Sequence, residues 1–574
     1  MNQNTIIHAL INNASVRPDK IAYIFLLDGQ HKKQEITFYE LYLKVLEYSK
    51  LLEGRFNKND RALLCYPWGL EYIISFLACI NNGLIAVPIF PPNTINNSRI
   101  KKIIADCTPK FALTSSEVAE KTDEADFGLK FLGLHLNEQQ NLNETTKIKF
   151  EVKNDFDFKD IALLQYTSGS TSNPKGVIVT HSNMLANSKL ITQNFQHDEN
   201  TVSVNWLPLY HDMGLMNGII QPVLLGMTCA IMSPTSFLKR PFRWLKAISD
   251  FKELGLITSG GPNFSYEICC NYIDEEHMRI LDLSKWHIAY SGAEPIRPST
   301  LRRFADKFTP CGFNYKNFYP LYGLAEATLM ASAGNINDEP IIKKIETESI
   351  KAGRAIETDG NDNYNYTEVV GCGTNLDGQK LLIVNPSTLC KCAENEIGEI
   401  WIAGPCVSNG YWDKPDINKE IFDAETKDTN EGHFLRTGDL GFFIKNELFV
   451  TGRLKELIII GGKNYYPQDI ELIVENEYKD IRAGCGAAFS IDINDEEKLV
   501  IVYEIHRKYL KHINIEDVIS SIRRAVSQNL GLNVYDIVFI ETSSFPKTSS
   551  GKLQRLLVKQ YYLNNKLKVI KSSL

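Results

Sequence analysis

The sequence predicts a mixed α/β fold that ends in a small α+β domain. Strand-like and helix-like stretches alternate through most of the chain, which is typical of parallel sheets covered by helices. Shorter strand-like pieces separated by Gly, Asn and Asp occupy residues 396–449 and favour a small antiparallel barrel. Beyond residue 452 the pattern changes again and predicts a separate small domain. A chain of 574 residues has room for roughly three or four folding units.

The N-terminal alternation is clearest in three consecutive stretches. Residues 61–66 are strand-like, residues 69–81 have a helical pattern, and residues 84–90 form another short apolar run. A strand, a helix and a second strand are the repeating unit of a parallel sheet, because parallel strands need a crossover connection. This part of the chain is therefore predicted to be layered α/β.

The later elements are shorter and are predicted individually. In the barrel we expect strands at 398–403, 433–436, 441–444 and 447–451, preceded by a strand at 380–384. In the small domain we expect a helix at 468–476, strands at 483–490 and 499–504, and an amphipathic helix at 515–528. Without a Pro- or Ser-rich linker, the parts are expected to be domains 1–452 and 457–574 joined by a hinge at 453–456.

Composition and charge exclude several classes of protein. Hydrophobic residues make up 44% of the chain and charged residues 23%, so a folded globular protein is expected rather than a disordered one. The 62 Lys and Arg against 69 Asp and Glu give a net charge of −7, which provides no overall field for a nucleic acid. The longest apolar runs, such as residues 457–460, are far shorter than the roughly 18 residues of a membrane span.

The twelve cysteines indicate reduced thiols. They are scattered along the chain, and the close pairs at 269–270 and 390–392 lack the C-x-x-C spacing of zinc or redox sites. No basic and apolar leader is found at the N-terminus. We therefore expect a cytoplasmic protein with no stable membrane insertion.

The most informative segment is a hydroxyl-rich loop, LQYTSGSTSNPKGV, at residues 164–177. Its glycines and its Ser and Thr side chains can bring hydrogen-bond donors close to phosphate oxygens, and Lys175 adds a mobile positive charge. It differs from a P-loop because Pro174 and Gly176 flank the lysine, where that motif has Gly and then Ser or Thr. The loop predicts a triphosphate site, with a flexible surface loop as the alternative.

Further motifs follow in a fixed order: SGAEP at 291–295, YGLAEAT at 322–328, LRTGDLG at 435–441, GRLKE at 452–456 and PKTSSGKLQR at 546–555. Together with the 164–177 loop they resemble the adenylate-forming superfamily of acyl-CoA synthetases, peptide-synthetase adenylation domains and luciferases. The resemblance covers most of the chain. It implies an N-terminal part of two α/β subdomains and a small β-barrel, followed by a mobile C-terminal lid that rotates about Lys455.

The resemblance also implies roles for single residues. Tyr322 would pack on adenine, and Glu326 would be the metal ligand that holds Mg²⁺ against the phosphates of ATP. Asp439 would accept hydrogen bonds from both ribose hydroxyls, which its two oxygens allow, and Arg453 would touch the ribose. The nucleotide-binding residues so implied are Thr167, Ser168, Gly169, Ser170, Thr171, Lys175, Ser291, Gly292, Ala293, Glu294, Tyr322, Gly323, Leu324, Asp439 and Arg453.

The last motif implies the mechanism. A carboxylate that attacks the α-phosphate of ATP brings two anions together, and a lysine that contacts both relieves this repulsion. By resemblance Lys552 is that lysine. Taken alone, Lys552 would more often be a solvated surface residue, and the surrounding T-S-S-G-K loop reverses that expectation. The implied catalytic residues are Lys552, His211, Thr167 and Glu326.

Two segments narrow the family. WLPLYHDMGL at 206–215 resembles the motif beside the acyl pocket of fatty acyl-AMP ligases, and the apolar residues 216–232 that follow suit either an acyl tunnel or a core. The polar segment 350–373 resembles the insertion thought to restrict domain movement in fatty acyl-AMP ligases, with a surface loop of no such role as the alternative. The implied acyl-binding residues are Trp206, His211, Asp212, Met213, Gly214, Met216 and Ile220.

We therefore expect a stand-alone fatty acyl-AMP ligase. It would activate a medium- or long-chain fatty acid with ATP and Mg²⁺ and release pyrophosphate. It would then transfer the acyl group to a separate acyl carrier protein of the polyketide or peptide synthase type. A fatty acyl-CoA synthetase is the nearest alternative, and a non-catalytic nucleotide or acyl-adenylate binding protein is an alternative of another class. No nucleic-acid partner is expected.

Overall fold

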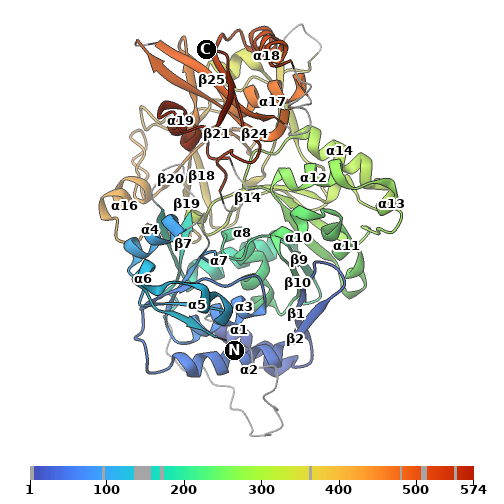
Figure 1. Ribbon diagram of the computed structural model, residues 1–574, viewed down its shortest axis with the longest axis vertical. Helices are drawn as coiled ribbons and strands as arrows, with labels where there is room; N and C mark the ends of the chain where they lie inside the picture. Colours follow the sequence, from blue (N-terminus) through green and yellow to red (C-terminus); the bar gives the residue numbers. More distant parts are fainter. Residues whose placement is uncertain are drawn as a thin grey trace.

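A computed structural model of the chain has a wide α/β body with a smaller domain above it (Figure 1). The structure describes residues 5–92, 97–134, 157–167, 174–360, 365–478, 481–494, 496–505, 514–548 and 553–574. The first helix, α1 (Ile6–Val16), lies at the foot of the body, and the C-terminus lies on the small domain at the opposite end. The predicted mixed α/β fold, large N-terminal part followed by a smaller C-terminal domain, is confirmed.

One sheet of the body contains the strands predicted near residues 61–90. Its order is β6-β5-β3-β4-β7-β8, and its strands are parallel except for the last pair. The strands are β3 (Arg61–Leu64), β4 (Ile85–Pro88), β5 (Phe111–Thr114), β6 (Phe131–Gly133), β7 (Ile161–Thr167) and β8 (Lys175–Thr180). Nearby helices are α2 (Phe38–Leu52), α3 (Leu70–Asn81), α4 (Asn97–Cys107), α5 (Ser116–Lys121), α6 (Glu124–Phe127) and α7 (His181–Phe195).

The second sheet of the body has nine strands in the order β17-β14-β13-β12-β11-β9-β10-β1-β2. It is parallel in the middle and antiparallel at both edges. Its strands are β1 (Ile21–Leu26), β2 (Lys33–Thr37), β9 (Val202–Asn205), β10 (Thr228–Met232), β11 (Ile257–Gly261), β12 (Trp286–Ser291), β13 (Phe318–Gly323), β14 (Met330–Ala333) and β17 (Thr374–Asn375). Helices beside it include α9 (Gln221–Leu225), α10 (Pro234–Lys239), α11 (Phe242–Asp250), α12 (Asn263–Tyr272), α13 (Glu275–Met278) and α14 (Pro298–Phe308).

The antiparallel strands predicted for the barrel form a four-stranded sheet in the order β18-β19-β20-β21. The sheet is open, because its edge strands β18 and β21 do not pair with one another. The strands are β18 (Lys380–Val384), β19 (Gly398–Ala403), β20 (Leu435–Ile444) and β21 (Glu447–Arg453). A hairpin of β15 (Ile342–Glu346) and β16 (Tyr366–Val370) packs against β21, with α15 (Thr347–Lys351) between its strands.

In its described residues the small domain has one sheet, one hairpin and three helices. The sheet contains β24 (Ile481–Ile493), β25 (Glu496–Ile505), β26 (Val534–Ile540) and β27 (Val569–Ser572) in that order. The hairpin is β22 (Ile458–Ile460) with β23 (Lys463–Tyr465), and the helices are α17 (Pro467–Glu477), α18 (Ile515–Leu530) and α19 (Arg555–Leu563). Helix α18 starts with Glu516 and Asp517 near its positive end and stops at Gly531 in the left-handed conformation, as helix termini favour.

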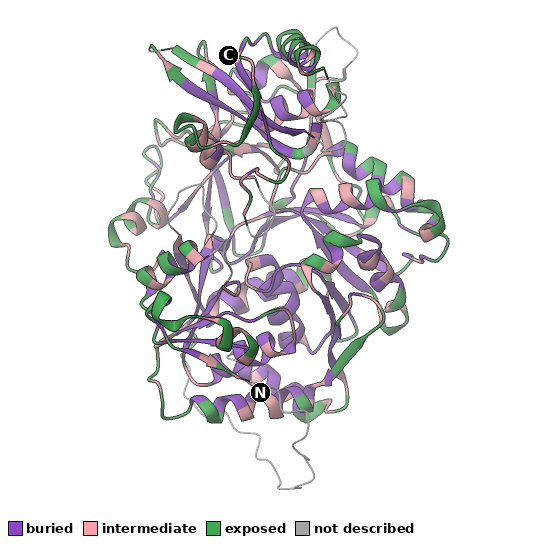
Figure 2. Ribbon diagram, viewed as in Figure 1, coloured by how far each residue is buried: buried purple, intermediate pink, exposed green. Residues whose placement is uncertain are grey.

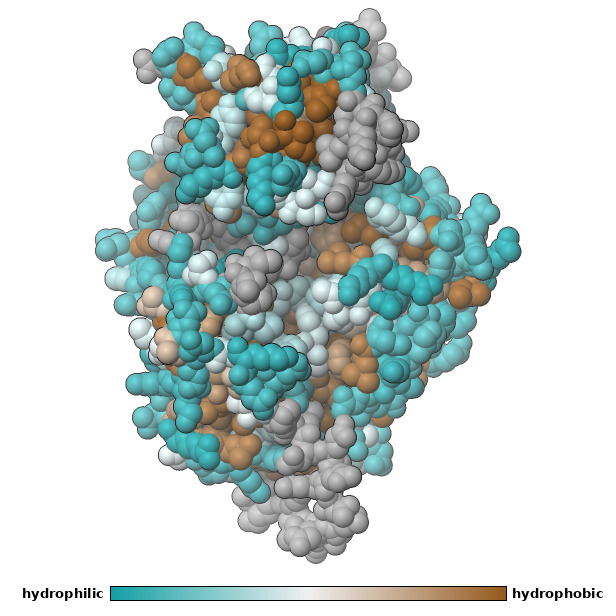
Figure 3. Space-filling view, in the orientation of Figure 1, coloured by the Kyte–Doolittle hydropathy of each residue, from teal (hydrophilic) through white to brown (hydrophobic). Residues whose placement is uncertain are grey.

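Each part has an apolar core of its own. In Figure 2 the buried residues follow the strands of both large sheets and, separately, the sheet of the small domain. The small domain buries residues such as Ile470, Ile501 and Ile522. It also exposes apolar side chains, among them Val569, Ile570 and Leu574, and Figure 3 shows hydrophobic surface on this domain. The predicted limits of the domains, 1–452 and 457–574, remain predictions.

Two further observations concern the whole chain. All twelve cysteines are unpaired, and ten of them are buried. In the part of the chain that the structure describes, no helix is both long and apolar enough to cross a membrane.

Candidate active site

A cavity of about 940 Å³ lies between the body and the small domain. Its volume is within the range of small-molecule sites, roughly 300–1,000 Å³. Strands β7, β13, β20 and β21 line it from the body, and helices α17 and α19 line it from the small domain. Of the residues predicted from the sequence, it brings together Thr167, His211, Asp212, Met213, Ala293, Glu294, Tyr322, Gly323, Leu324, Glu326, Asp439 and Arg453.

Three of these residues form a hydrogen-bonded chain. The Tyr322 hydroxyl donates to Asp439 Oδ2 at 2.8 Å, and Arg453 Nε donates to Asp439 Oδ1 at 3.0 Å. Asp439 and Arg453 are partners in the β20-β21 ladder, which fixes their spacing. Burial and then the neighbouring Asp439 raise the pKa of Tyr322, so the hydroxyl remains a donor. Asp439 raises the pKa of Arg453 against the opposing effect of burial, so the guanidinium remains charged.

The 291–295 motif forms a tight turn after β12. Ala293 has a φ of +66°, a left-handed conformation that costs a non-glycine residue roughly 1–2 kcal/mol. Glu294 Oε1 accepts a hydrogen bond from the Phe264 backbone N–H at 2.6 Å, which ties the turn to α12. Ala293 and Glu294 line the cavity, whereas Ser291 and Gly292 pack behind it, Gly292 against Leu321.

The hydroxyl-rich loop begins and ends at paired strand positions. Thr167 closes β7, Lys175 opens β8, and the two residues are partners in the antiparallel ladder. The predicted phosphate-binding residues Ser168, Gly169, Ser170 and Thr171 lie outside the described residues, so their role stays a prediction. Lys175 does not line the cavity.

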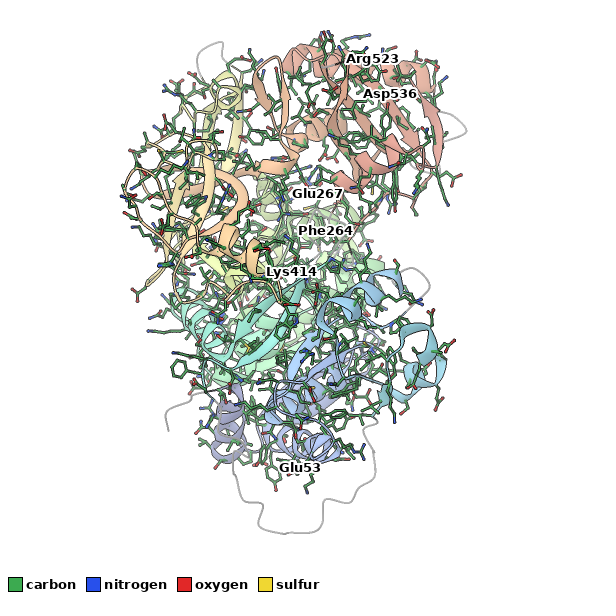
Figure 4. The ribbon with its side chains drawn as sticks, turned by 90° about the vertical axis from the view of Figure 1, so that its left-hand side faces the viewer. Glu53, Phe264, Glu267, Lys414, Arg523 and Asp536 are labelled. Carbon is green, nitrogen blue, oxygen red and sulfur yellow. The ribbon has the colours of Figure 1, made fainter. Side chains whose placement is uncertain are left out.

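Helix α4 holds the loop at its start. Arg99 Nη2 donates to the Thr167 carbonyl oxygen at 3.2 Å, and the Tyr166 hydroxyl donates to Asp106 Oδ2 at 2.6 Å. Lys414, labelled in Figure 4, forms an ion pair with the same Asp106 at 2.7 Å. These contacts fix the end of β7, and with it Thr167, against helix α4.

Glu326 and Lys175 are both disfavoured in their charged forms by burial. Burial raises the pKa of Glu326, and the Tyr411 hydroxyl, which donates to Glu326 Oε1 at 2.8 Å, opposes that shift. Burial, and then the positive charge of Lys455, lower the pKa of Lys175. A ligand that brought a cation to the carboxylate and phosphate oxygens to the lysine would stabilise both charges.

His211, Asp212 and Met213 form another part of the cavity wall. His211 is the N-cap of the short helix α8 (Asp212–Leu215), and its Nδ1 is in polar contact with Asp212 Oδ1. His211 and Asp212 therefore reach the cavity wall as a neighbouring pair. The wall therefore combines a polar pair with the apolar Met213 side chain.

The other predicted acyl-binding residues lie outside the lining of this cavity. The Trp206 ring packs in the main core with its centroid 4.1 Å from that of Phe237. Met216 and Ile220 belong to a π-helix (Met216–Ile220) and are buried, and Gly214 packs against the Pro208 carbonyl. Their acyl-binding role stays a prediction.

The predicted catalytic lysine, Lys552, lies outside the described residues. The residues before and after that undescribed stretch, Thr548 and Leu553, both line the cavity. Arg555 follows closely and donates from Nε and Nη2 to the two carboxylate oxygens of Glu471, each at 2.7 Å, and from Nη1 to Glu456 at 2.9 Å. The predicted hinge residue, Lys455, sits in the short turn Leu454–Glu456 beside this cluster.

Comparison with known protein families shows the family to which this chain belongs. The family described as AMP-binding enzyme matches residues 10–412, which is more than half of the chain. This chain belongs to the AMP-binding enzyme family. Residues 455–572 of this AMP-binding enzyme match a second family, described as the AMP domain of Disco-interacting protein 2-like proteins.

Known relatives match the AMP-binding enzyme over nearly its whole length. JamA of Moorena producens, by name a medium-chain-fatty-acid–[acyl-carrier-protein] ligase, is 38% identical over 98% of this chain and 96% of its own. FadD21 of Mycobacterium tuberculosis, provisionally named a fatty-acid–CoA ligase, is 34% identical over 98% of this chain and 99% of its own. The crystal structure of a fatty acyl-adenylate ligase from Legionella pneumophila, in complex with acyl adenylate and pyrophosphate, is 34% identical with a TM-score of 0.75, covering 99% of this chain and 97% of that one.

Three residues of the AMP-binding enzyme's site were not found from the sequence. Arg99, Asp106 and Tyr411 each contact a predicted site residue or its neighbour, and each lies far from that partner along the chain. None of them belongs to the motifs identified above. No signal within the sequence of one chain points to such residues, because the contacts exist only in the folded protein.

Proposed function

We propose that this AMP-binding enzyme is a fatty acyl-AMP ligase that activates a medium- or long-chain fatty acid with ATP. The observation that carries the proposal is the cavity, which gathers the Tyr322–Asp439–Arg453 chain, Glu326 and the His211–Asp212 pair around one space. These groups suit a nucleoside, a metal-bound polyphosphate and a carboxylic acid. The names of JamA and of the Legionella ligase support the class of acid.

In the proposed first step a carboxylate oxygen of the fatty acid attacks the α-phosphorus of ATP. The bond from that phosphorus to the oxygen bridging to the β-phosphorus breaks, and pyrophosphate leaves with its electron pair. Because two anions must approach one another, catalysis depends on positioning and on positive charge. We propose that Lys552 bridges the carboxylate and the α-phosphate, and the placement of Thr548 and Leu553 in the cavity wall supports this role.

The nucleoside is proposed to bind at the Tyr322–Asp439–Arg453 chain. An ionised carboxylate has about four acceptor sites, so Asp439 can keep its bonds to Tyr322 and Arg453 while it accepts both ribose hydroxyls. Tyr322 would present its ring to the adenine. The remaining proposed nucleotide contacts are Thr167, Ser168, Gly169, Ser170, Thr171, Lys175, Ser291, Gly292, Ala293, Glu294, Gly323 and Leu324.

We propose that Mg²⁺ binds to Glu326 together with the phosphates of ATP. The site fits this ion, because Mg²⁺ usually takes one or two carboxylates plus substrate phosphates and waters. Among the described residues no group of three or more His, Cys, Asp or Glu side chains is placed to hold a metal ion, so ATP would supply the remaining ligands. When bound, the ion would neutralise charge on the departing pyrophosphate.

The fatty acid is proposed to place its carboxylate beside His211 and Asp212, with its first carbons at Met213. These three residues line the cavity from the body, at the start of α8. Trp206, Gly214, Met216 and Ile220 would contact the acyl chain where it passes beyond Met213 into the core. A core lined with apolar side chains suits a hydrocarbon tail.

In the proposed second step the phosphopantetheine thiol of a separate acyl carrier protein attacks the acyl carbon, the thiol loses its proton, and AMP leaves. The described part of the 350–373 segment supports a carrier rather than CoA, because it ties the small domain to the body. The Lys351 ammonium donates to the Leu530 carbonyl oxygen at 3.2 Å, and the neighbouring Glu348 pairs with Lys463 at 2.9 Å. We infer that these contacts oppose the lid rotation and that the carrier belongs to a polyketide or peptide synthase.

Fatty-acid-dependent exchange of labelled pyrophosphate into ATP tests the first step. A panel of saturated acids is expected to support exchange, with an optimum at medium or long chain length. Absence of exchange with every acid would overturn the proposed function and favour a non-catalytic binding protein.

The acceptor is tested with dodecanoate, ATP and either CoA or a phosphopantetheinylated carrier protein. We expect thioester formation on the carrier and little on CoA. Efficient formation of the CoA thioester by the unmodified enzyme would overturn the choice of acceptor. Lys351→Ala is expected to increase CoA thioester formation, and Lys343→Ala, which breaks the Lys343–Glu357 pair within the body, is the matched control.

The compartment is a further part of the proposal. Twelve unpaired cysteines are expected where thiols are kept reduced. We therefore place the enzyme in the cytoplasm.

A further inference from the structure

The chain that leads from β19 into α16 (Pro415–Phe422) pairs antiparallel with residues 176–178 of β8. The Ile178 N–H donates to the Gly410 carbonyl at 2.9 Å, and the Trp412 N–H donates to the Gly176 carbonyl at 2.8 Å. Residue 411 lies between these two bonds and forms an antiparallel bridge with Val177. The backbone of Tyr411 is therefore held opposite Val177, which is two residues from Lys175 along β8.

The Tyr411 side chain contacts both Glu326 and Lys175. Its hydroxyl donates to Glu326 Oε1 at 2.8 Å, and the Lys175 ammonium lies 4.7 Å from the centre of its ring. A cation over an aromatic face is attracted by the ring, and a hydroxyl that donates to a carboxylate makes a strong hydrogen bond. One side chain thus holds a cation with its face and an anion with its edge.

Tyr411 is itself rigidly held. Its backbone N–H donates to Asn418 Oδ1 at 2.7 Å, and Asn418 Nδ2 donates back to the Tyr411 carbonyl at 2.8 Å. The Phe422 ring packs edge-on, with its centroid 5.1 Å away. Gly410 has a φ of +117°, and a Cβ there would lie 2.7 Å from Asn418 Cγ, so the close approach requires glycine. Tyr411 is 7% exposed and is not part of the cavity wall, so it can act only through its neighbours.

We propose that Tyr411 is a positioning residue that couples Glu326 to Lys175. Its hydroxyl occupies one oxygen of Glu326 and leaves Oε2 for a cation bound to a polyphosphate, while its ring holds the Lys175 ammonium in reach of the same polyphosphate. The inference deepens the proposed function and rests on Glu326 and Lys175 serving the metal–ATP complex. Removal of a partner that orients a metal ligand typically changes metal affinity or activity roughly 10–100-fold.

The test uses the full chain with Tyr411→Phe, which keeps the ring, and Tyr411→Leu, which removes it. Tyr272→Phe, at a position that is 68% exposed, is the control. One readout is the free Mg²⁺ concentration that gives half-maximal dodecanoate-dependent pyrophosphate exchange. The other needs no turnover: the gain in melting temperature when Mg²⁺ is added to the enzyme with ATP and no fatty acid.

Tyr411→Phe should raise the half-maximal Mg²⁺ concentration roughly tenfold and shrink the melting gain, with the KM for dodecanoate changed less than about twofold. Tyr411→Leu should in addition raise the KM for ATP, because Lys175 loses its support. The melting temperature of each ligand-free variant shows whether it folds.

A double-mutant cycle shows whether Tyr411 acts through Glu326. In the Glu326→Gln background, Tyr411→Phe should change the Mg²⁺-dependent melting gain by an amount equivalent to less than about twofold in affinity. An unchanged Mg²⁺ requirement in Tyr411→Phe, or an equal shift in both backgrounds, would overturn the proposal. If the unmodified enzyme shows the melting gain but exchanges no pyrophosphate with any fatty acid, the proposed function fails and the melting readout still decides the role of Tyr411.

Discussion

The Tyr322 hydroxyl donates to Asp439 across the junction of two sheets. Tyr322 lies in β13 of the nine-stranded sheet and Asp439 lies in β20 of the antiparallel sheet, so the 2.8 Å bond joins the two sheets at the cavity. Asp439 also holds Arg453, the last residue before the turn that leads to the small domain. Hydrogen bonds to Asp439 therefore connect Tyr322, the proposed adenine contact, with Arg453 at the start of the proposed hinge.

Asp439→Asn tests the proposed ribose contact. The amide keeps the shape of the side chain but loses the charge, one acceptor oxygen and the ion pair with Arg453. We expect the KM for ATP to rise at least about tenfold with little change in the KM for the fatty acid. Tyr322→Phe keeps the ring and removes one hydrogen bond, worth about 1 kcal/mol, so a rise of roughly fivefold is expected. Equal effects of the two variants on pyrophosphate-exchange kinetics would contradict the assignment.

Lys552→Ala separates nucleotide binding from chemistry. If the ammonium contacts mainly the reacting carboxylate and α-phosphate, its loss removes stabilisation that is strongest in the transition state. We expect pyrophosphate exchange to fall roughly 100- to 1,000-fold while the dissociation constant for ATP, measured by calorimetry, changes little. A matching loss of ATP affinity would assign Lys552 to substrate binding instead.

Arg555→Ala is expected to destabilise the small domain. Glu471 and Glu456 share this arginine, and removing it leaves the buried Glu471 carboxylate without its ion-pair partner at a cost of about 3–5 kcal/mol. Replacing Arg555 by Met together with Glu471 by Leu should recover part of the loss, since the more deeply buried carboxylate is then removed, while Glu456 still lacks its ion pair. Arg523→Ala, at an exposed position of the amphipathic helix α18 (Figure 4), is the control; it removes only solvent-exposed hydrogen bonds to Tyr535 and Ser573 and should cost at most about 1 kcal/mol in urea unfolding.

Asp469, in the first turn of α17, makes stability depend on pH. Burial, and then the like charge of Glu471, raise its pKa to about 7, while Arg297 opposes the shift. The folded-state pKa is above the unfolded value of about 3.9, so this group's stabilising contribution is complete below about pH 4 and is lost as the pH rises to 7. Asp469→Asn stays neutral and avoids this loss.

Urea unfolding at pH 4 and pH 8 measures the effect. We expect Asp469→Asn to match the unmodified protein at pH 4 and to exceed its stability at pH 8 by at most about 4 kcal/mol. Asp517→Asn, at an exposed position of α18, controls for loss of a charge near a helix start. A stability difference that does not change with pH would show that Asp469 titrates normally.

Much of the fold was predictable because it is encoded locally. Strands 380–384 and 398–403 were predicted with their observed limits, and the helix expected at 69–81 begins one residue later. The strands expected at 433–436 and 441–444 are one strand, β20. The residues between them contain Gly438 with a φ of +72° and form a bulge, but Asp439 and Leu440 pair with β21 and Leu440 also pairs with β19, so the strand continues.

In the described part of the 350–373 segment, too, the observed structure depends on pairing with other parts of the chain. A surface loop was the alternative interpretation of this polar segment, yet Tyr366–Val370 pairs along its length with β15, and the Glu368 carboxylate receives a bidentate pair of hydrogen bonds from Arg302 at 2.7 and 2.9 Å. Strand β15 lies just before this segment, but Arg302 comes from α14, far earlier in the chain. Composition alone therefore underestimates its order.

The sequence by itself determined the class of fold, the family and the identity of the motif residues, because hydrophobic periodicity and contiguous motifs are properties of short stretches of chain. The tertiary structure alone decided which residues meet. It brought Tyr411 to Glu326 and Lys175, set Arg99 behind Thr167, and left Trp206 in the core instead of the cavity wall. Such contacts join positions far apart in the chain, and they form only when long-range packing fixes both backbones, which no local pattern records.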